Sequence, residues 1–357
     1  MSKLVPERIS KIDPYVPGKP TEEIEREYGI KDSIKLASNE NPLGPSPKVV
    51  EAICKAANRV HLYPIGDAYY LRKKLSEKHD VPMEQIICGS GSVDILEMMP
   101  RAFLENDENV VTSELTFVSY KIATYMVNTN YREAPLKDFR YNLDAILDLI
   151  DKKTKIVFIA NPNNPTGTLI RKKEFEEFLA KLPPHPILVL DEAYFEYIDD
   201  PEYPNGMDYL DSRDRIIVLR TFSKSYALAG LRVGYGVSSK EIIDVLNKVR
   251  SPFNVNTLAQ AAAVAALEDT DRIEKTRGLN KKGLDYLSKE FDRIGLKYVP
   301  SYGNFILTFP EKPAAEVDEE LKKRGIIARP GGEKALRISV GTEEQNRKII
   351  KALEEIL

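Results

Sequence analysis

Long uninterrupted apolar runs, rather than alternating ones, mark the strands that we expect before residue 225. They lie within residues 85–92, 108–114, 155–168, 186–197 and 215–224. A helical pattern at residues 69–79 precedes the first of these strands. Strands that are buried on both faces have continuous apolar sequences. The pattern therefore predicts an α/β fold with a mostly parallel central sheet covered by helices on both faces.

The pattern changes after about residue 250, where helices become longer and strands shorter. Residues 258–269 and 272–295 predict long helices, and residues 305–310 and 335–341 predict short strands. A final helix is expected to begin at Thr342, because Gln345 is placed to complete a capping box. These elements are typical of a smaller α+β domain appended to the large one.

We therefore expect three segments in this chain. Residues 1–45, rich in proline and charge, form an arm that joins the small domain or a dimer interface. Residues 46–255 form the large domain, which carries the ligand site, and residues 256–357 form the small C-terminal domain. A length of 357 residues is in keeping with two domains.

Charge and composition exclude several classes of protein. The net charge is −3 and no block of basic residues occurs, so we expect no nucleic-acid partner and no membrane partner. The first residues have no apolar core of signal-peptide length, and we expect a cytoplasmic protein. With two cysteines and three histidines, a metal site or a histidine-based triad is hard to assemble. Catalytic chemistry is therefore expected from lysine, carboxylate or a cofactor.

Polar clusters follow the predicted strands at residues 89–92, 161–168, 191–194 and 221–224. Taken singly, each has an ordinary structural explanation, as a turn, a loop, a helix cap or a solvated surface lysine. In open parallel sheets, however, ligands bind beyond the carboxyl ends of the strands. The joint occurrence of the four clusters at such ends therefore predicts one shared ligand site.

The chemistry of these clusters fits one cofactor. Backbone N–H groups of Ser92 and Val93, at an expected helix N-terminus, suit a phosphate, and Ser223 and Arg232 add donors to the same anion. Asp191 is costly to bury unless it meets a cation such as a protonated ring nitrogen. Lys224 can form a Schiff base with an aldehyde. Phosphate, ring nitrogen and aldehyde together describe pyridoxal 5′-phosphate.

Motifs along nearly the whole chain resemble those of fold-type I, class I/II pyridoxal-phosphate-dependent aminotransferases, and most closely the histidinol-phosphate aminotransferases. The resemblance rests on "DPYVPGKP" (13–20), "KLASNENPLGPSP" (35–47), "YP" (63–64), "NPNNPTGT" (161–168), "DEAYFEY" (191–197), "TFSKSYALAGLRVGYG" (221–236), "PFNVNTLAQAA" (252–262) and "LRISVGT" (336–342).

The resemblance implies roles around the cofactor. Lys224 carries it and then moves the proton of the substrate α-carbon, and Asp191 pairs with the ring nitrogen. Asn164 and Tyr194 hydrogen-bond the ring hydroxyl. Phe117 stacks on the ring at a position where the family more often has tyrosine.

It also implies contacts with the phosphate and the substrate. Ser92, Val93, Ser223 and Arg232 hold the cofactor phosphate, which Tyr63 of a partner subunit also reaches, so that a homodimer shares its active sites. Arg337 binds the substrate carboxylate, and Arg329 and Tyr15 lie near the distal phosphate. The stretch "PGGEKAL" between the two arginines is shorter than is usual in the family.

Four functions remain open at this point. The first is transamination of L-histidinol phosphate with 2-oxoglutarate, which gives imidazole acetol phosphate and L-glutamate in histidine biosynthesis. The second is an aromatic amino acid aminotransferase, and the third is a pyridoxal-phosphate-dependent amino-acid-phosphate decarboxylase. The fourth, a non-enzymatic cofactor-sensing module, is disfavoured because the chain has no spare DNA-binding segment.

Overall fold

The computed structural model describes residues 5–10, 12–14 and 18–357 of the chain. The helices are α1 (Glu7–Ser10), α2 (Thr21–Tyr28), α3 (Pro47–Ala57), α4 (Tyr69–His79), α5 (Ser92–Phe103), α6 (Ser119–Met126), α7 (Leu143–Leu149), α8 (Lys172–Lys181), α9 (Lys240–Val249), α10 (Thr257–Leu267), α11 (Thr270–Ile294), α12 (Ala314–Lys323) and α13 (Glu343–Ile356). The strands are β1 (Ile34–Lys35), β2 (Ile86–Gly89), β3 (Asn109–Ser113), β4 (Asn130–Ala134), β5 (Thr154–Ala160), β6 (Ile187–Asp191), β7 (Ile216–Thr221), β8 (Gly234–Ser238), β9 (Lys297–Val299), β10 (Phe305–Phe309), β11 (Ile326–Ile327), β12 (Arg329–Pro330) and β13 (Leu336–Ser339).

The large sheet has the order β2-β8-β7-β6-β5-β3-β4 and comprises seven strands among the described residues. Neighbours from β7 to β4 pair in parallel, whereas β8 runs antiparallel to both β7 and β2. The predicted mostly parallel sheet is thus confirmed. The antiparallel strand β8 was not predicted, because its sequence "GYGVS" contains two glycines and gives no continuous apolar run.

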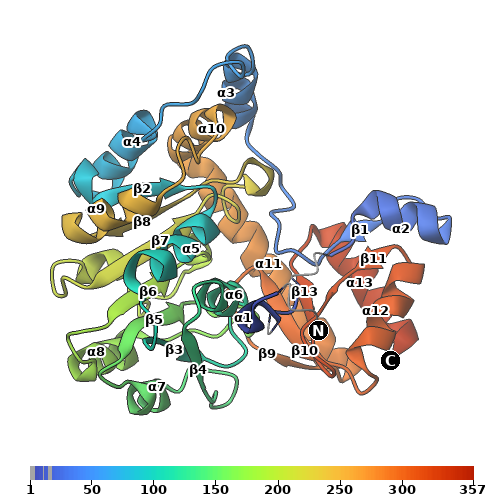
Figure 1. Cartoon of the computed structure of the whole chain (residues 1–357). Coiled ribbons are helices and arrows are strands. Elements are labelled where there is room, and N and C mark those ends of the chain that lie inside the picture. The colour runs from blue at the N-terminus through green and yellow to red at the C-terminus, as the bar shows by residue number, and fades with distance from the viewer. Residues whose placement is uncertain (1–4, 11, 15–17) are drawn as a thin grey trace.

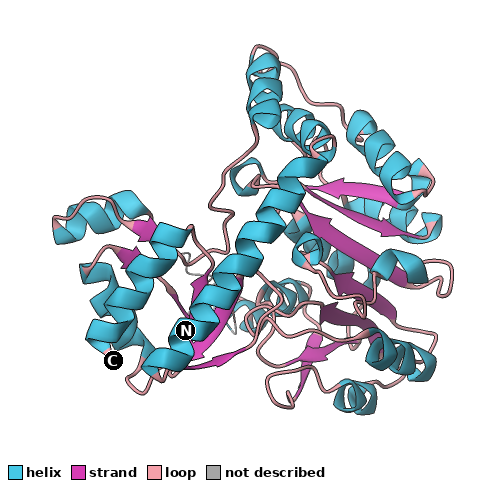
Figure 2. Ribbon diagram, turned by 180° about the vertical axis from the view of Figure 1, so that it is seen from behind, coloured by secondary structure: helices cyan, strands magenta, loops and turns pink. Residues whose placement is uncertain are grey.

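Both faces of this sheet are covered by helices (Figures 1 and 2). On one face, side chains of α5, α6 and α9 pack on Ile156, Phe158 and Val189. On the other, α7 and α8 pack on Val157 and Leu188. Successive residues of one strand point to opposite faces, so both sets must be apolar, and this explains the continuous apolar runs.

A second sheet near the C-terminus has the order β12-β13-β10-β9 and is antiparallel throughout. Helices α11, α12 and α13 contribute to its apolar core (Figure 1). In the short sheet β1-β11, Ile34 pairs in parallel with Ile326, so the N-terminal segment attaches to this C-terminal part. Thr342 and Gln345 form the predicted capping box at the start of α13, with hydrogen bonds of 2.9 and 3.2 Å.

The placement of α10 and α11 bears on the expected domain boundaries, which stay a prediction. Helix α10 follows residue 255 yet packs on α3 and α4, with Ala259 and Ala263 buried beside Val49 and Leu71. Helix α11 then runs towards the smaller sheet (Figure 2). No helix among the described residues is long and apolar enough to span a membrane.

Candidate active site

The strand topology brings the predicted polar clusters together at the carboxyl ends of the parallel strands of the large sheet. Ala160 and Asp191, the last residues of β5 and β6, are direct partners in register. A cavity of about 510 Å³ opens beside them. The predicted residues that line it are Ser92, Val93, Phe117, Asn164, Asp191, Tyr194, Ser223, Lys224, Arg232 and Arg337.

One end of the cavity is a cradle for an anion. Gly91 has φ 79°, and a Cβ there would lie 2.6 Å from Nη2 of Arg232. A Cβ at Gly234 would lie 2.4 Å from the backbone nitrogen of Ser92. These glycines therefore let the N-terminus of α5 and a guanidinium approach the same space, which concentrates N–H donors and positive charge.

Arg232 is held in place by its own loop. Its Nη1 donates to the carbonyl of Ala229 at 3.1 Å and to Oγ of Ser223 at 3.4 Å. Ser223 also accepts a hydrogen bond from Oγ1 of Thr221, 3.0 Å away. Arg232 adopts φ 57°, an uncommon conformation for a residue other than glycine. The loop that follows β7 thus orients both donors towards the cradle.

Asp191 lies at another wall of the cavity and is 5% exposed. Its carboxylate accepts hydrogen bonds from Oη of Tyr120 at 2.8 Å and from the backbone nitrogen of Ala193 at 3.2 Å. Burial raises the pKa of Asp191 to about 6, although the Tyr120 hydrogen bond acts in the opposite direction. A cation bound beside this carboxylate would offset the cost of its burial.

Tyr120 is a functional candidate that the sequence reasoning missed. Its ring is buried and stacks on Phe158 with the centroids 4.6 Å apart. Burial, with Asp191 nearby, holds the pKa of Tyr120 well above its ordinary value, so the phenol stays protonated and donates. Tyr120 lies three residues after Phe117, in the first turn of α6, and no strand-end pattern marks it.

Lys224 extends into the same cavity from the loop after β7. Its Nζ donates to the carbonyl of Ser38 at 3.1 Å. Burial, together with the positive charges of Arg337 and Arg232, lowers the pKa of Lys224 to about 7. A substantial fraction of the amine is therefore neutral and nucleophilic near neutral pH.

Arg337 bonds directly to Asn164, and both Arg337 and Tyr194 bond to the N-terminal segment. Arg337 donates from Nη1 to Oδ1 of Asn164 at 2.7 Å and from Nη2 to the carbonyl of Ala37. Tyr194 Oη accepts a hydrogen bond from Nδ2 of Asn39 at 2.9 Å. Asn39 is buried and was not predicted as a site residue, although it lies in one of the recognised motifs.

Two of the predicted residues, Tyr63 and Arg329, do not line this cavity. Tyr63 is 82% exposed and stacks on Phe253 at 4.6 Å rather than lining this cavity. Arg329 lies on β12, directly opposite Arg337 on β13, and is not among the residues that line the cavity. Tyr15 lies outside the described residues.

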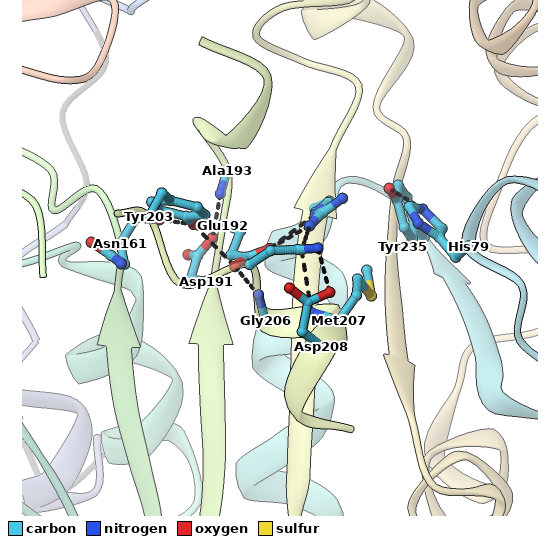
Figure 3. Close-up of polar contacts among 12 residues, drawn as sticks. His79, Asn161, Asp191, Glu192, Ala193, Tyr203, Gly206, Met207, Asp208 and Tyr235 are labelled. Carbon is cyan, nitrogen blue, oxygen red and sulfur yellow. Dashed lines mark hydrogen bonds and ion pairs between the residues drawn. The ribbon is translucent and has the colours of Figure 1, made fainter. Parts of the chain in front are cut away.

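A buried ion pair lies behind the Asp191 wall. Arg220 donates from Nε and Nη2 to Oε2 of Glu192 at 3.0 and 2.7 Å, and both side chains are almost fully buried. The other Glu192 oxygen accepts from the backbone of Gly206 and from Tyr203 Oη (Figure 3). Because Glu192 follows β6 and Arg220 lies on β7, the pair joins the two strand ends that present Asp191 and Lys224.

Each polar end of pyridoxal 5′-phosphate finds a fitting group in this cavity. The anion cradle suits its phosphate, buried Asp191 suits a protonated ring nitrogen, and Lys224 with its lowered pKa suits the aldehyde. The fold and the site thus define a fold-type I enzyme that uses pyridoxal 5′-phosphate. The chain belongs to the aminotransferase class I and II family, which matches residues 31–353.

Individual relatives agree with this assignment and with the resemblance expected from the sequence. A histidinol-phosphate aminotransferase of Moorella thermoacetica is 47% identical over 356 residues, covering 98% of this chain and 92% of the relative. The histidinol-phosphate aminotransferase of Caldicellulosiruptor saccharolyticus is 44% identical, and the match covers 98% of this chain and 99% of the relative. Histidinol-phosphate aminotransferase from Sinorhizobium meliloti, solved in complex with pyridoxal-5′-phosphate, has a TM-score of 0.91 at 27% identity, covering 100% of this chain and 98% of the other.

Proposed function

We propose that this enzyme transfers the amino group of L-histidinol phosphate to 2-oxoglutarate, giving imidazole acetol phosphate and L-glutamate in histidine biosynthesis. The relatives' names support this substrate. The structural observation that supports the proposal is that Arg337 lines the cavity and that Arg329, outside the lining, is its direct partner across β12 and β13, so that a second guanidinium lies next to the first. Histidinol phosphate brings a phosphate and glutamate brings carboxylates, and a guanidinium can bind either anion.

Each side chain of the cavity has its own role in this proposed reaction. When bound, pyridoxal 5′-phosphate supplies an electron sink for the pair of electrons left when the substrate α-proton departs. Asp191 keeps a proton on the ring nitrogen, and Tyr120 holds that carboxylate in place. Lys224 Nζ removes the α-proton, for which its lowered pKa suits it. Arg232, Ser223 and the N-terminus of α5 hold the phosphate in the cradle.

We propose further that two copies of the chain form a homodimer in which Tyr63 completes the partner's phosphate cradle. Tyr63 does not line the cavity of its own chain. Other exposed apolar side chains lie near Tyr63 in the sequence, and Phe253 stacks on its ring. Together with Tyr63, the exposed apolar residues are Val60, Leu62, Ile65, Tyr69, Tyr70 and Phe253. Large exposed apolar patches mark interaction surfaces. We also propose that the dimer works in the cytoplasm.

The test is an assay of purified enzyme with 2-oxoglutarate and, in turn, histidinol phosphate, phenylalanine and tyrosine. Glutamate formation should be fastest with histidinol phosphate. Arg329→Ala should lower kcat/KM for histidinol phosphate by about 10- to 100-fold, because a charge-assisted contact to the phosphate is lost. Phenylalanine, which has no distal anion, should be much less affected. Faster turnover of phenylalanine by the wild type, or release of carbon dioxide, would overturn the proposal.

A further inference from the structure

The charged side chains that line the cavity outnumber those that the cofactor and the substrate anions need. Arg232 is assigned to the cofactor phosphate, Arg337 to a substrate anion, Lys224 to the aldehyde and Asp191 to the ring nitrogen. Two further carboxylates line the cavity, those of Glu40 and Glu97. Glu40 is engaged by Lys35, whose Nζ lies 2.9 Å from Oε1. Glu97 is therefore the cavity carboxylate that still lacks a function.

Glu97 lies on the cavity side of helix α5. It follows Val93 by four residues, so the two side chains share a helix face, and both line the cavity. Across residues 5–10, 12–14 and 18–357, its carboxylate makes no hydrogen bond and no ion pair within 4.0 Å, and the charges of Arg101 and Asp94 act on it only from a greater distance. Arg101, one turn further on, donates from Nε to the Glu97 backbone carbonyl at 3.1 Å.

Asp94, on the same helix, differs from Glu97 in that its carboxylate is hydrogen-bonded within the chain. Its Oδ2 accepts hydrogen bonds from the Ser90 backbone at 2.9 Å and from Nδ2 of Asn254 at 2.7 Å. Glu97, by contrast, faces the cavity and is half-buried. Burial raises its pKa, which means that the site holds this carboxylate at some cost in solvation.

The walls beside Glu97 suit a flat ring. Ser119 and Ile122 line the same cavity and lie on α6, the helix that packs against α5. An aliphatic wall with one acceptor at its edge would hold a planar heterocycle that carries an N–H group. An amino acid with a plain phenyl ring offers no such donor.

We propose that Glu97 is a specificity-determining residue that accepts a hydrogen bond from the imidazole N–H of the substrate. This inference rests on the proposed function, because it takes histidinol phosphate as the amino donor. A phenyl ring in the same place would leave the Glu97 carboxylate desolvated and without a donor. A site that hydrogen-bonds an N–H group of its substrate rejects analogues without that group, because its acceptor is then left without a partner. Glu97 thus favours imidazole over phenyl substrates of equal size.

The experiment compares two amines that differ in the ring alone, histidinol phosphate and phenylalaninol phosphate. The ratio of their kcat/KM values is measured for the wild type, Glu97→Gln and Glu97→Leu. The ratio should favour histidinol phosphate in the wild type and fall by about 10- to 100-fold in Glu97→Leu, the loss of one charge-assisted hydrogen bond. Glu97→Gln, which keeps one acceptor oxygen, should lie between the two.

Two controls distinguish recognition of the imidazole ring from a general defect of the cavity. The rate of the half-reaction with glutamate should change less than about twofold in both Glu97 variants, since glutamate carries no ring. Glu40→Gln, which removes the ion-paired carboxylate of the same cavity, should leave the ring preference unchanged. A Glu97→Leu ratio equal to that of the wild type, or an equal shift in Glu40→Gln, overturns the role of Glu97. Failure of the wild type to use histidinol phosphate overturns the proposed function itself.

Discussion

Lys224 and Asp191 titrate within a narrow range of pH although they begin from very different ordinary values. Burial lowers the pKa of Lys224 to about 7 and raises that of Asp191 to about 6. Near pH 7, therefore, an ionised carboxylate coexists with a partly neutral amine. This pairing of protonation states is what capture of an aldehyde beside a protonated ring requires.

The rate at which cofactor-free enzyme takes up pyridoxal 5′-phosphate should rise with pH through about 7. The reason is that the neutral fraction of the Lys224 amine grows as pH rises through its pKa. Stopped-flow absorbance would measure the rate. In Arg337→Met the midpoint should move upward, because the Arg337 charge helps to lower that pKa. A rate that rises only near pH 10 would contradict the assignment.

Tyr120→Phe should lower kcat/KM most at acidic pH. The Tyr120 hydrogen bond lowers the pKa of Asp191, so its loss raises that pKa and leaves less carboxylate ionised below pH 7. About a tenfold loss is expected at pH 6.5, with most of the activity recovered at pH 8.5. A pH profile of kcat/KM tests this. An equal loss at every pH would instead indicate a packing defect, since phenylalanine keeps the stack on Phe158.

Among single residues, the sequence was sufficient to predict the site residues that follow directly after strands. Asp191 and Lys224 follow apolar runs, and parallel pairing brings such ends together. Tyr120 and Asn39 could not be found in this way, because their contacts join residues 71 and 155 positions apart. The chain gives no local signal for these contacts.

At the scale of elements, the Glu192–Arg220 pair stabilises the alignment of β6 and β7. The guanidinium also lies 3.4 Å above the centre of the Phe195 ring. Removing one member leaves the other charge buried without its partner. The sequence predicted both strands but not this pair, since Glu192 was noted only within a motif.

Glu192→Gln should therefore lower the free energy of unfolding by about 3–5 kcal/mol. Chemical denaturation followed by circular dichroism would measure the change. Lys181→Met breaks an ion pair with Asp144 that lies on the surface, at 3.1 Å, and serves as the control. It should have almost no effect, because exposed pairs contribute little. Equal changes in the two variants would show that the buried pair has no special role.

At the scale of the whole molecule, the proposed dimer would cover Tyr63, which is exposed in the single chain. Alone, the Lys224→Ala variant should be almost inactive and the Tyr63→Ala variant only weakly active. Mixed and reassembled in equal amounts, they should recover roughly a quarter of the wild-type rate per site, since half of the dimers contain one intact site. Activity assays after reassembly and a measured mass in solution test this. A fully active monomer would be incompatible with shared sites.

The pairing of β12 with β13 brings two positive charges together, which lowers the stability of the hairpin. Arg329 and Arg337 occupy directly opposed positions, and like charges so placed destabilise an antiparallel pair. Replacing either arginine by an uncharged residue would remove this repulsion and, under the proposed function, would also remove a binding group for the substrate's anions. Heat resistance and substrate choice therefore place opposite demands on this pair of positions.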